Sequence, residues 1–439
     1  MLIVWLMVLL SALDFSFRGP LRASGDHAND FAAPYISARL WLRHQNPYEP
    51  SAFFPTWHQA QGPQGQIYVN PSSLHSVYPP PSIVCLVPFA LLPWPIAMPA
   101  YILTSVALYL TALLLLAQLA PGTWQGLHKP AFLACGLAFA PVHSSLHVSN
   151  PSCLSASLLF LGIYLILRPG HSNATQPIKP STSTLETLAT AALLALSICI
   201  KPTQGSVILV FLLWSRAWRT LAATLTAILL ITATSLLPLL HLGQAWLSQL
   251  NSNIHYAFTD GTASLFPSNL VRLDRIDLQL PLYILTDSTM LAAKVAAAIA
   301  AILLLAAFTL PLGTLVPIRN QALLRLSVML AIGILPTYQR FYSATVLLLA
   351  ILWAIRNLSA PPATRRIARA ILALSTIFLL NTTVLQRYFQ LAQRLSGHLP
   401  VFANAFIAPH LNWFLLGFAL LLLAAVPITS RDAAPPATT

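Results

Sequence analysis

Two carboxylates stand four positions apart in the stretch ASGDHANDFAAPYISARLWLRHQNPYEP, residues 23–50. Asp26 and Asp30 share it with two histidines and several aromatic side chains. One carboxylate beside a substrate hydroxyl can act as a general base, whereas a pair can hydrolyse glycosides or bind a metal. Eight of the ten acidic residues of the chain lie in Asp14–Glu49 and Asp260–Asp287. Carboxylate chemistry is therefore expected in these two stretches.

The segment 30–43, DFAAPYISARLWLR, is expected to form a helix. Phe31, Tyr35 and Leu42 recur at helical spacing, which predicts an amphipathic helix on the outer surface. Asp30 then lies at or near the N-terminus of that helix. Two interpretations stand for this residue, because aspartate caps helices and also performs chemistry.

Basic residues at the ends of apolar segments are the second group of candidates. Lys201 closes an apolar stretch and is followed by Pro202. It either extends its ammonium group toward the interface or faces an anionic group. Arg340 lies between Tyr338 and Tyr342. It is either an interfacial anchor or a clamp for a phosphate, which suits the planar guanidinium group.

The composition identifies the class of protein. The 439 residues are 57% hydrophobic and 8% charged, against about 25% charged in soluble domains. Apolar runs long enough to span a bilayer, about 20 residues each, recur along the chain. Spanning segments must be helices or closed barrels, and strand-like alternation is absent. We predict an all-α, polytopic transmembrane helical bundle of about 11–13 membrane helices, forming one integral-membrane domain over 1–439.

Two longer polar stretches, 18–80 and 241–287, interrupt the apolar series and are predicted to be outer loops. Short loops on one side contain twelve Lys and Arg residues against four on the other, which predicts a cytoplasmic N-terminus. The segment 82–94 makes the number of crossings odd; it is re-entrant, or the boundaries within 82–120 differ. The N-terminal run MLIVWLMVLLSAL lacks a basic leader and a cleavage signal, so we expect a membrane helix.

Other functional classes are not expected. The net charge of +13 comes mostly from arginines in short loops, which favours membrane orientation over nucleic-acid binding. Cys85, Cys135, Cys153 and Cys199 lie in or beside apolar segments without metal-ligand spacing. No glycine-rich nucleotide loop or HExxH motif is present. We therefore expect no cofactor and no metal.

Taken in chain order, these motifs resemble glycosyltransferase family 87 (DUF2029), a family of integral-membrane enzymes with the GT-C fold. The resemblance runs over most of the chain, from about residue 20 to 360. The motifs that carry it are Asp30, Phe31, Tyr35 and Ala38, then Asn46–Tyr48, Tyr78–Pro81, Lys201–Pro202 and Tyr338–Ser343.

The chain departs from the family pattern at three places. The family's Gly–Gln–x–Asn is here HVSN, so Asn150 alone is retained. Gln339 stands where some members have His, and Ser343 stands where they have Asp. If these positions bind the sugar or assist the base, the choice of donor or acceptor differs, or activity is reduced.

The resemblance implies transfer of a mannose- or arabinofuranose-like sugar from a polyprenyl-phosphate donor. The acceptor is a lipid or glycan at the extracytoplasmic face of the plasma (inner) membrane. Asp30 is expected to act as the general base of an inverting transfer, with Asp26 as the second candidate. The donor phosphate is expected to be bound by Arg340, Lys201 and His75. Further substrate contacts are expected from Tyr35, Tyr48, Tyr78, Asn150, Tyr338, Asn269 and Arg272.

Two alternatives remain open, a transporter or flippase of lipid-linked sugars and a catalytically degenerate family member. Transporters usually place charges or helix breaks at the middle of the membrane. Lys294 is the clear charge within an apolar segment, while the carboxylates lie in the outer loops. This distribution favours an enzyme that acts at the membrane interface.

Overall fold

The computed structural model describes residues 1–23, 29–63, 75–168, 183–269, 271–310, 318–379, 391–392, 394–395 and 401–431. Within these ranges the regular structure is helical, and one isolated antiparallel bridge joins Arg275 to Arg340.

The helices up to residue 214 are α1 (Leu2–Arg18), α2 (Pro20–Ala23), α3 (Asn29–Leu42), α4 (Pro50–Gln59), α5 (Pro80–Cys85), α6 (Val87–Ala90), α7 (Trp94–Gln118), α8 (His128–Leu137), α9 (Ala140–His147), α10 (Ser152–Leu167), α11 (Thr184–Ile200), α12 (Pro202–Gly205) and α13 (Val207–Trp214). The later α-helices are α14 (Trp218–Leu236), α15 (Ala245–Thr259), α16 (Gln279–Thr286), α17 (Thr289–Thr309), α18 (Ile318–Gly333), α19 (Leu348–Arg356), α20 (Pro362–Ser375), α22 (Val401–Ile407) and α23 (His410–Arg431). Four short 3₁₀-helices accompany them: η3 (Leu237–Leu242), η4 (Arg272–Asp274), η5 (Phe341–Leu347) and η6 (Thr376–Leu379).

The helices are apolar enough for a multi-pass membrane protein, as predicted. Five of the described helices can cross a membrane by length and composition: Leu2–Ala23, Trp94–Gln118, Trp218–Leu242, Thr289–Thr309 and His410–Ile428. Shorter apolar helices are Ser152–Leu167, Thr184–Ile200, Pro202–Trp214 and Phe341–Arg356. The exact number of membrane helices stays a prediction.

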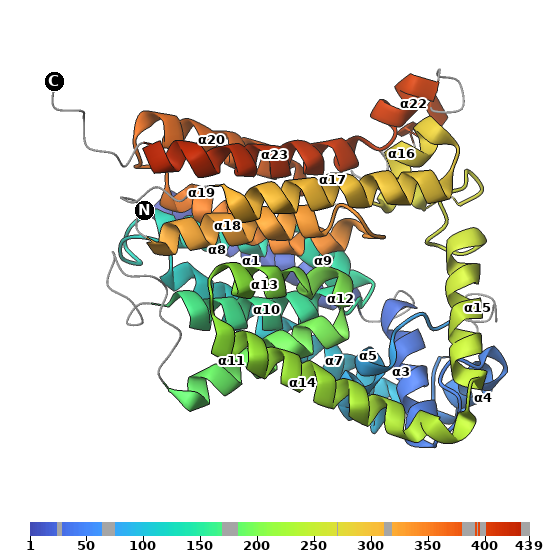
Figure 1. Cartoon of the computed structure of the whole chain (residues 1–439). Helices are drawn as coiled ribbons and strands as arrows, with labels where there is room; N and C mark the ends of the chain where they lie inside the picture. The colour runs from blue at the N-terminus through green and yellow to red at the C-terminus, as the bar shows by residue number, and fades with distance from the viewer. Residues whose placement is uncertain are drawn as a thin grey trace, which may run out of the picture.

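The long helices lie side by side, and the bundle has two different ends (Figure 1). The start of α1 and the end of α23 lie at one end, while α3, α4 and α15 lie at the other. Helices α5 and α6 have six and four residues, so even α5 is only about 9 Å long. The segment 82–94 is therefore too broken to cross as one helix. Without this segment the number of predicted crossings is even, which agrees with the start of α1 and the end of α23 lying at the same end of the bundle (Figure 1).

Helix α3 is held by a cluster of aromatic rings. Phe31 is fully buried and stacks on Tyr101, with ring centroids 4.0 Å apart and planes 11° apart. The Trp94 ring also stacks on Phe31, with centroids 5.7 Å apart, and the Phe89 ring meets Phe31 edge-on at 6.0 Å. Buried aromatic side chains contribute large apolar areas and prefer such offset or edge-to-face pairs. The residue after Asp30 therefore fixes the start of α3 against α7.

Protein surrounds α3 on nearly all sides, which differs from the expected amphipathic surface helix. Helices α4, α5 and α6 pack against it, and the Trp41 indole N–H donates to the Ser235 carbonyl of α14 at 2.9 Å. The Ser37 hydroxyl donates to the Pro47 carbonyl at 2.9 Å. The apolar residues of α3 do recur at helical spacing, as predicted. The first outer loop, however, folds back and covers the polar face of the helix as well.

Replacing Phe31 by alanine is expected to lower the free energy of unfolding by about 3–5 kcal/mol, the usual cost of removing a buried aromatic ring. Unfolding in mixed micelles measures this change. The matched control is Phe54→Ala on α4, whose side chain is 41% exposed. Equal destabilisation by the two variants would contradict the anchoring of α3 by the aromatic cluster.

Candidate functional site

Asp30 joins the first outer loop to the break between α9 and α10. Its backbone N–H donates to the Val148 carbonyl at 3.2 Å. Its carboxylate Oδ2 accepts a hydrogen bond from Asn150 Nδ2 at 2.7 Å. A capping aspartate would accept a hydrogen bond from the backbone of its own helix. The Asp30 side chain instead connects to another segment of the chain.

The break between α9 and α10 has a left-handed turn that presents Asn150. Ser149 has φ 57°, a conformation that usually selects glycine at the end of a helix. The Asn150 N–H donates to the Ser145 carbonyl at 2.8 Å, and the Ser145 hydroxyl donates to the Asn150 carbonyl at 2.9 Å. These bonds end α9 and hold the Asn150 backbone in place. Pro151 follows, so the next helix starts in a new direction.

The Asn150 amide is oriented by donors on its oxygen. Oδ1 accepts from the Ser152 N–H at 2.9 Å, from the Ser152 hydroxyl at 2.6 Å and from Lys201 Nζ at 3.4 Å. Because the oxygen faces three donors, the NH₂ group must face the other way, toward Asp30. One amide therefore bridges a carboxylate and an ammonium group.

Lys201 lies between α11 and α12, where Pro202 begins a new helix. Its ammonium group donates to the hydroxyls of Ser152 and, at 3.2 Å, Ser343. It also lies 4.5 Å from the centroid of the Tyr342 ring, a cation–π distance. Lys201 therefore faces the interior of the bundle, where the other site residues lie, instead of extending toward lipid headgroups.

Arg340 lies between α18 and η5 and is held by the second outer loop. Its Nε donates to the Tyr338 hydroxyl at 2.6 Å, and its Nη2 donates to the Thr262 carbonyl at 3.3 Å. The backbone bridge to Arg275 fixes the same segment. Asp277 also contributes, because its Oδ2 accepts the Gln339 N–H at 3.1 Å.

Electrostatic coupling places Asp30, Arg340 and two phenols in one cluster. Burial raises the pKa of Tyr78 well above its ordinary value, and the Asp30 charge raises it further. Burial also raises the pKa of Tyr338, which Arg340 lowers and Asp30 raises. Both hydroxyls stay neutral, so they can donate hydrogen bonds beside the carboxylate.

Further expected residues lie behind this cluster. The Tyr78 hydroxyl donates to the Asp30 carbonyl at 3.4 Å, and the buried Tyr48 hydroxyl donates to the Tyr78 carbonyl at 3.0 Å. The His75 ring stacks on Tyr256 of α15 with centroids 4.4 Å apart. Tyr48 thus contacts Tyr78, which contacts Asp30, whereas His75 contacts α15. The predicted substrate contacts of Tyr48 and His75 stay predictions.

Three expected contact residues donate hydrogen bonds to backbone carbonyls, Tyr35 to one in the segment 82–94 and Asn269 and Arg272 to ones within 241–287, and their predicted substrate contacts stay predictions. The Tyr35 hydroxyl, fully buried, donates to the Leu92 carbonyl at 2.7 Å. Asn269 Nδ2 donates to the Ser264 carbonyl at 2.7 Å, and Arg272 Nη1 donates to the Leu265 carbonyl at 3.2 Å. These bonds give the three side chains structural roles. Asp26, the second candidate for the base, lies outside the described residues.

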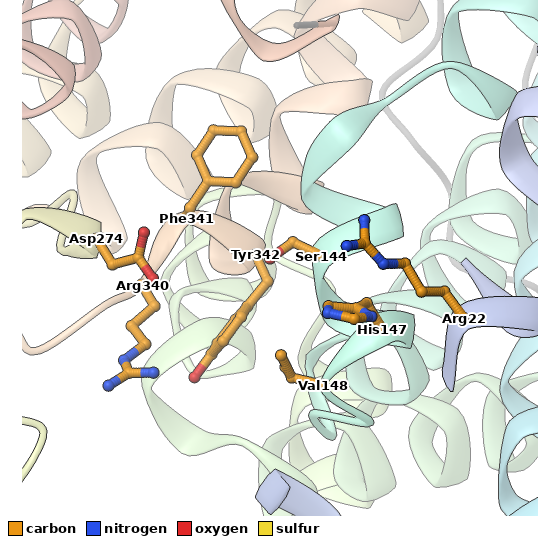
Figure 2. A pocket seen from close by; sticks show the side chains of 8 residues that line it. All are labelled: Arg22, Ser144, His147, Val148, Asp274, Arg340, Phe341 and Tyr342. Carbon is orange, nitrogen blue, oxygen red and sulfur yellow. The ribbon is translucent and has the colours of Figure 1, made fainter. Parts of the chain in front are cut away.

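A pocket of about 60 Å³ adjoins Arg340, and most of the residues around it were not expected from the sequence. It is lined by Arg22, Ser144, His147, Val148, Asp274, Arg340, Phe341 and Tyr342 (Figure 2). Asp274 is a carboxylate of the second outer loop, whose clustering of acidic residues was the available signal.

Across the part of the chain that the structure describes, no three His, Cys, Asp or Glu side chains group as metal ligands.

Comparison with known proteins identifies the relatives of the chain. The model of glycosyltransferase family 87 matches residues 77–335, which is more than half of the chain. This range includes Tyr78, Asn150 and Lys201, whereas Asp30 and Arg340 lie outside it. A search of curated proteins gives no significant match.

Two solved structures of ArnT from Cupriavidus metallidurans are also similar. The structure bound to undecaprenyl phosphate has a TM-score of 0.40 and 15% identity, covering 98% of this chain and 78% of the other. The apo structure has a TM-score of 0.40 and 14% identity, covering 95% and 77%.

Replacing Asn150 by alanine is expected to lower the free energy of unfolding by about 1–3 kcal/mol, because buried charged groups lose a hydrogen-bond partner. Unfolding in mixed micelles measures the change, with Gln118→Ala on the exposed far end of α7 as control. Asn150→Asp, of equal size, would set a second carboxylate beside Asp30 and is expected to destabilise at neutral pH. If Asn150→Asp left the free energy of unfolding unchanged at neutral pH, the result would contradict the bridge between Asp30 and Lys201.

Proposed function

Because the chain belongs to glycosyltransferase family 87, we propose that this membrane glycosyltransferase uses a polyprenyl-phosphate sugar as donor. The acceptor is the hydroxyl group of a lipid or glycan. The site lies on the extracytoplasmic face of the plasma membrane. Helix α19 ends and helix α20 begins at the end of the bundle opposite α3 and α15 (Figure 1). Basic residues favour the cytoplasmic side, so the arginines of this region support the orientation: Arg356, Arg365, Arg366 and Arg369.

One observation carries the proposal: a carboxylate and two basic side chains meet from three distant parts of the chain. Asp30 Oδ2 and Lys201 Nζ contact the same Asn150 amide, at 2.7 and 3.4 Å. Arg340 acts electrostatically on Tyr78 and Tyr338, the same phenols that Asp30 affects. A glycosyl transfer needs a base for the acceptor and positive charge for the leaving phosphate.

Asp30 has one carboxylate oxygen available for the acceptor. Asn150 binds Oδ2, and Oδ1 makes no hydrogen bond with the described residues. The acceptor oxygen attacks the anomeric carbon, its proton passes to Asp30, and the bond from that carbon to the phosphate oxygen breaks. The bonding electrons leave with the phosphate. A single displacement of this kind inverts the anomeric configuration.

Lys201 and Arg340 stabilise the charge that develops on the departing phosphate. Both are held by hydrogen bonds before substrate arrives, Lys201 by Ser343 and Arg340 by Tyr338. Such preorganised charges need little rearrangement during the reaction, which makes them effective in a site shielded from water.

The departures from the family pattern fit an active site with an altered environment. Ser343 gives Lys201 a hydroxyl partner where other members have a carboxylate, so less of the ammonium charge is neutralised locally. Gln339 is buried and donates to the Thr203 carbonyl at 3.1 Å. These positions bear on the choice of donor, and both mannose and arabinofuranose donors belong in the assay.

Replacing Asp30 by asparagine is expected to abolish most transfer of radiolabel from polyprenyl-phosphate mannose or polyprenyl-phosphate arabinofuranose in membranes. Loss of a general base costs roughly 10²–10⁴-fold in rate. The control is Asp260→Asn, in an exposed residue of the second loop.

Unchanged transfer by Asp30→Asn would contradict the base assignment. Transport of a lipid-linked sugar in liposomes without transfer would instead select the flippase. Binding without transfer or transport by the unmodified protein would select a degenerate family member.

Replacing Lys201 by methionine is expected to lower kcat by about 10²-fold, because one group that stabilises the leaving phosphate is lost. Lys201→Arg retains a positive charge and is expected to keep part of the rate. Initial rates at saturating donor measure both variants, with Lys294→Met on the exposed side of α17 as control. Equal rates for Lys201→Met and the unmodified protein would exclude Lys201 from the transfer step.

A further inference from the structure

The pocket beside Arg340 has two chemically different sides. In Figure 2, Asp274 and Arg340 lie on one side, Arg22 and His147 lie on the other, and Tyr342 lies between them. Its volume of about 60 Å³ is several times the roughly 10–15 Å³ that a cavity needs to hold one water. This room suits one face of a sugar ring with its hydroxyl groups.

Asp274 is a carboxylate that the fold itself does not use. Its side chain makes no hydrogen bond or ion pair with the described residues, and it faces the pocket. Burial raises the pKa of Asp274, the Arg340 charge lowers it and the Asp30 charge raises it. A half-buried carboxylate without a hydrogen-bond donor is costly, so a ligand that supplies donors would relieve that cost.

The charges of the pocket favour a hydroxylated ligand over a second phosphate. A phosphate near Arg22 and Arg340 would also meet the negative charge of Asp274. Sugar hydroxyl groups both donate and accept, so they can donate to Asp274 and accept from Arg22, Ser144 or Tyr342. A pocket that mixes one carboxylate with basic and hydroxyl side chains therefore matches a polyol.

We infer that Asp274 binds hydroxyl groups of the sugar being transferred and thereby takes part in donor selection. Arg340 lines the pocket and is also the proposed clamp for the donor phosphate, to which that sugar is bonded. The sugar on a phosphate held by Arg340 thus lies within reach of Asp274, while Asp30 serves the acceptor. The inference rests on the proposed function and extends it to the recognition of the sugar.

The test separates sugar binding from lipid-phosphate binding. Equilibrium binding to the detergent-solubilised protein is measured for polyprenyl phosphate and for polyprenyl phosphate bearing mannose or arabinofuranose. The sugar is expected to increase affinity for at least one of these donors. Asp274→Ala is expected to remove roughly 10- to 100-fold of that increase, the range for a hydrogen bond to a charged group. Its affinity for sugar-free polyprenyl phosphate is expected to be retained or increased, because the variant removes a negative charge beside Arg340.

Two further variants make the result specific to Asp274. Asp260→Ala removes an exposed carboxylate of the same loop, whose Oδ2 accepts a hydrogen bond from the neighbouring Thr259 hydroxyl, and is expected to leave both affinities unchanged. Asp274→Asn retains the shape and one acceptor oxygen, and is expected to fall between alanine and the unmodified protein.

The outcomes distinguish the inference from the proposed function. A sugar-dependent increase that Asp274→Ala leaves intact would overturn the role of Asp274 while leaving the donor class in place. Equal weakening of both lipids by Asp274→Ala would also overturn it, since the residue would then act on the phosphate or the fold. Binding of neither lipid to the unmodified protein would overturn the proposed function and the inference together.

Discussion

The hydrogen bonds of a single amide set the geometry on which the rest of the site depends. Asn150 gives its NH₂ group to Asp30 and its oxygen to Ser152 and Lys201. Removing either charge from water without a partner would cost several kcal/mol. The amide satisfies part of both and fixes the separation between the proposed base and one proposed cation. The break between α9 and α10 presents this side chain, and Ser149 immediately before it has a left-handed conformation.

The second outer loop performs the corresponding task for Arg340. Arg275 and Asp277 form a fully buried ion pair with an N–O distance of 2.9 Å. Asp277 also accepts the Gln339 N–H, and the Ile276 N–H donates to the Gln339 carbonyl at 2.9 Å. A buried pair of this kind contributes little net stability unless further hydrogen bonds satisfy it. Here those bonds fix the position of the segment before Arg340, so the loop that contains Asp274 also holds the proposed phosphate clamp.

The sequence predicted the class of fold because membrane helices follow from composition alone. It also predicted a helix at α3, since apolar spacing is a local property. The buried environment of α3 was not predictable, because Phe89, Trp94 and Tyr101 reach Phe31 from later helices. The sequence showed that an apolar stretch closes at Lys201 before Pro202, without revealing that this break meets the turn at Asn150.

The candidate site was predictable where the family resemblance supplied motifs and not where contacts are purely three-dimensional. Asp30, Asn150, Lys201 and Arg340 each lie in a recognisable motif, and the fold brings them into one cluster. Asp274 has arginines on either side of it in the sequence, RLDR, so the local pattern was indistinguishable from a surface segment. Arg272 was predicted to contact the substrate, and the sequence did not reveal that its guanidinium group donates to the Leu265 carbonyl of the same loop.

We propose that Lys201 and Arg340 bind the donor phosphate beside Asp30. A crystal or cryo-EM structure of the protein with polyprenyl phosphate would show where the phosphate binds. We expect phosphate density within hydrogen-bond distance of Arg340 Nη and Lys201 Nζ, with the Asn150–Asp30 bond retained. Phosphate bound elsewhere on the bundle, with Arg340 and Lys201 unchanged in their present contacts, would contradict it.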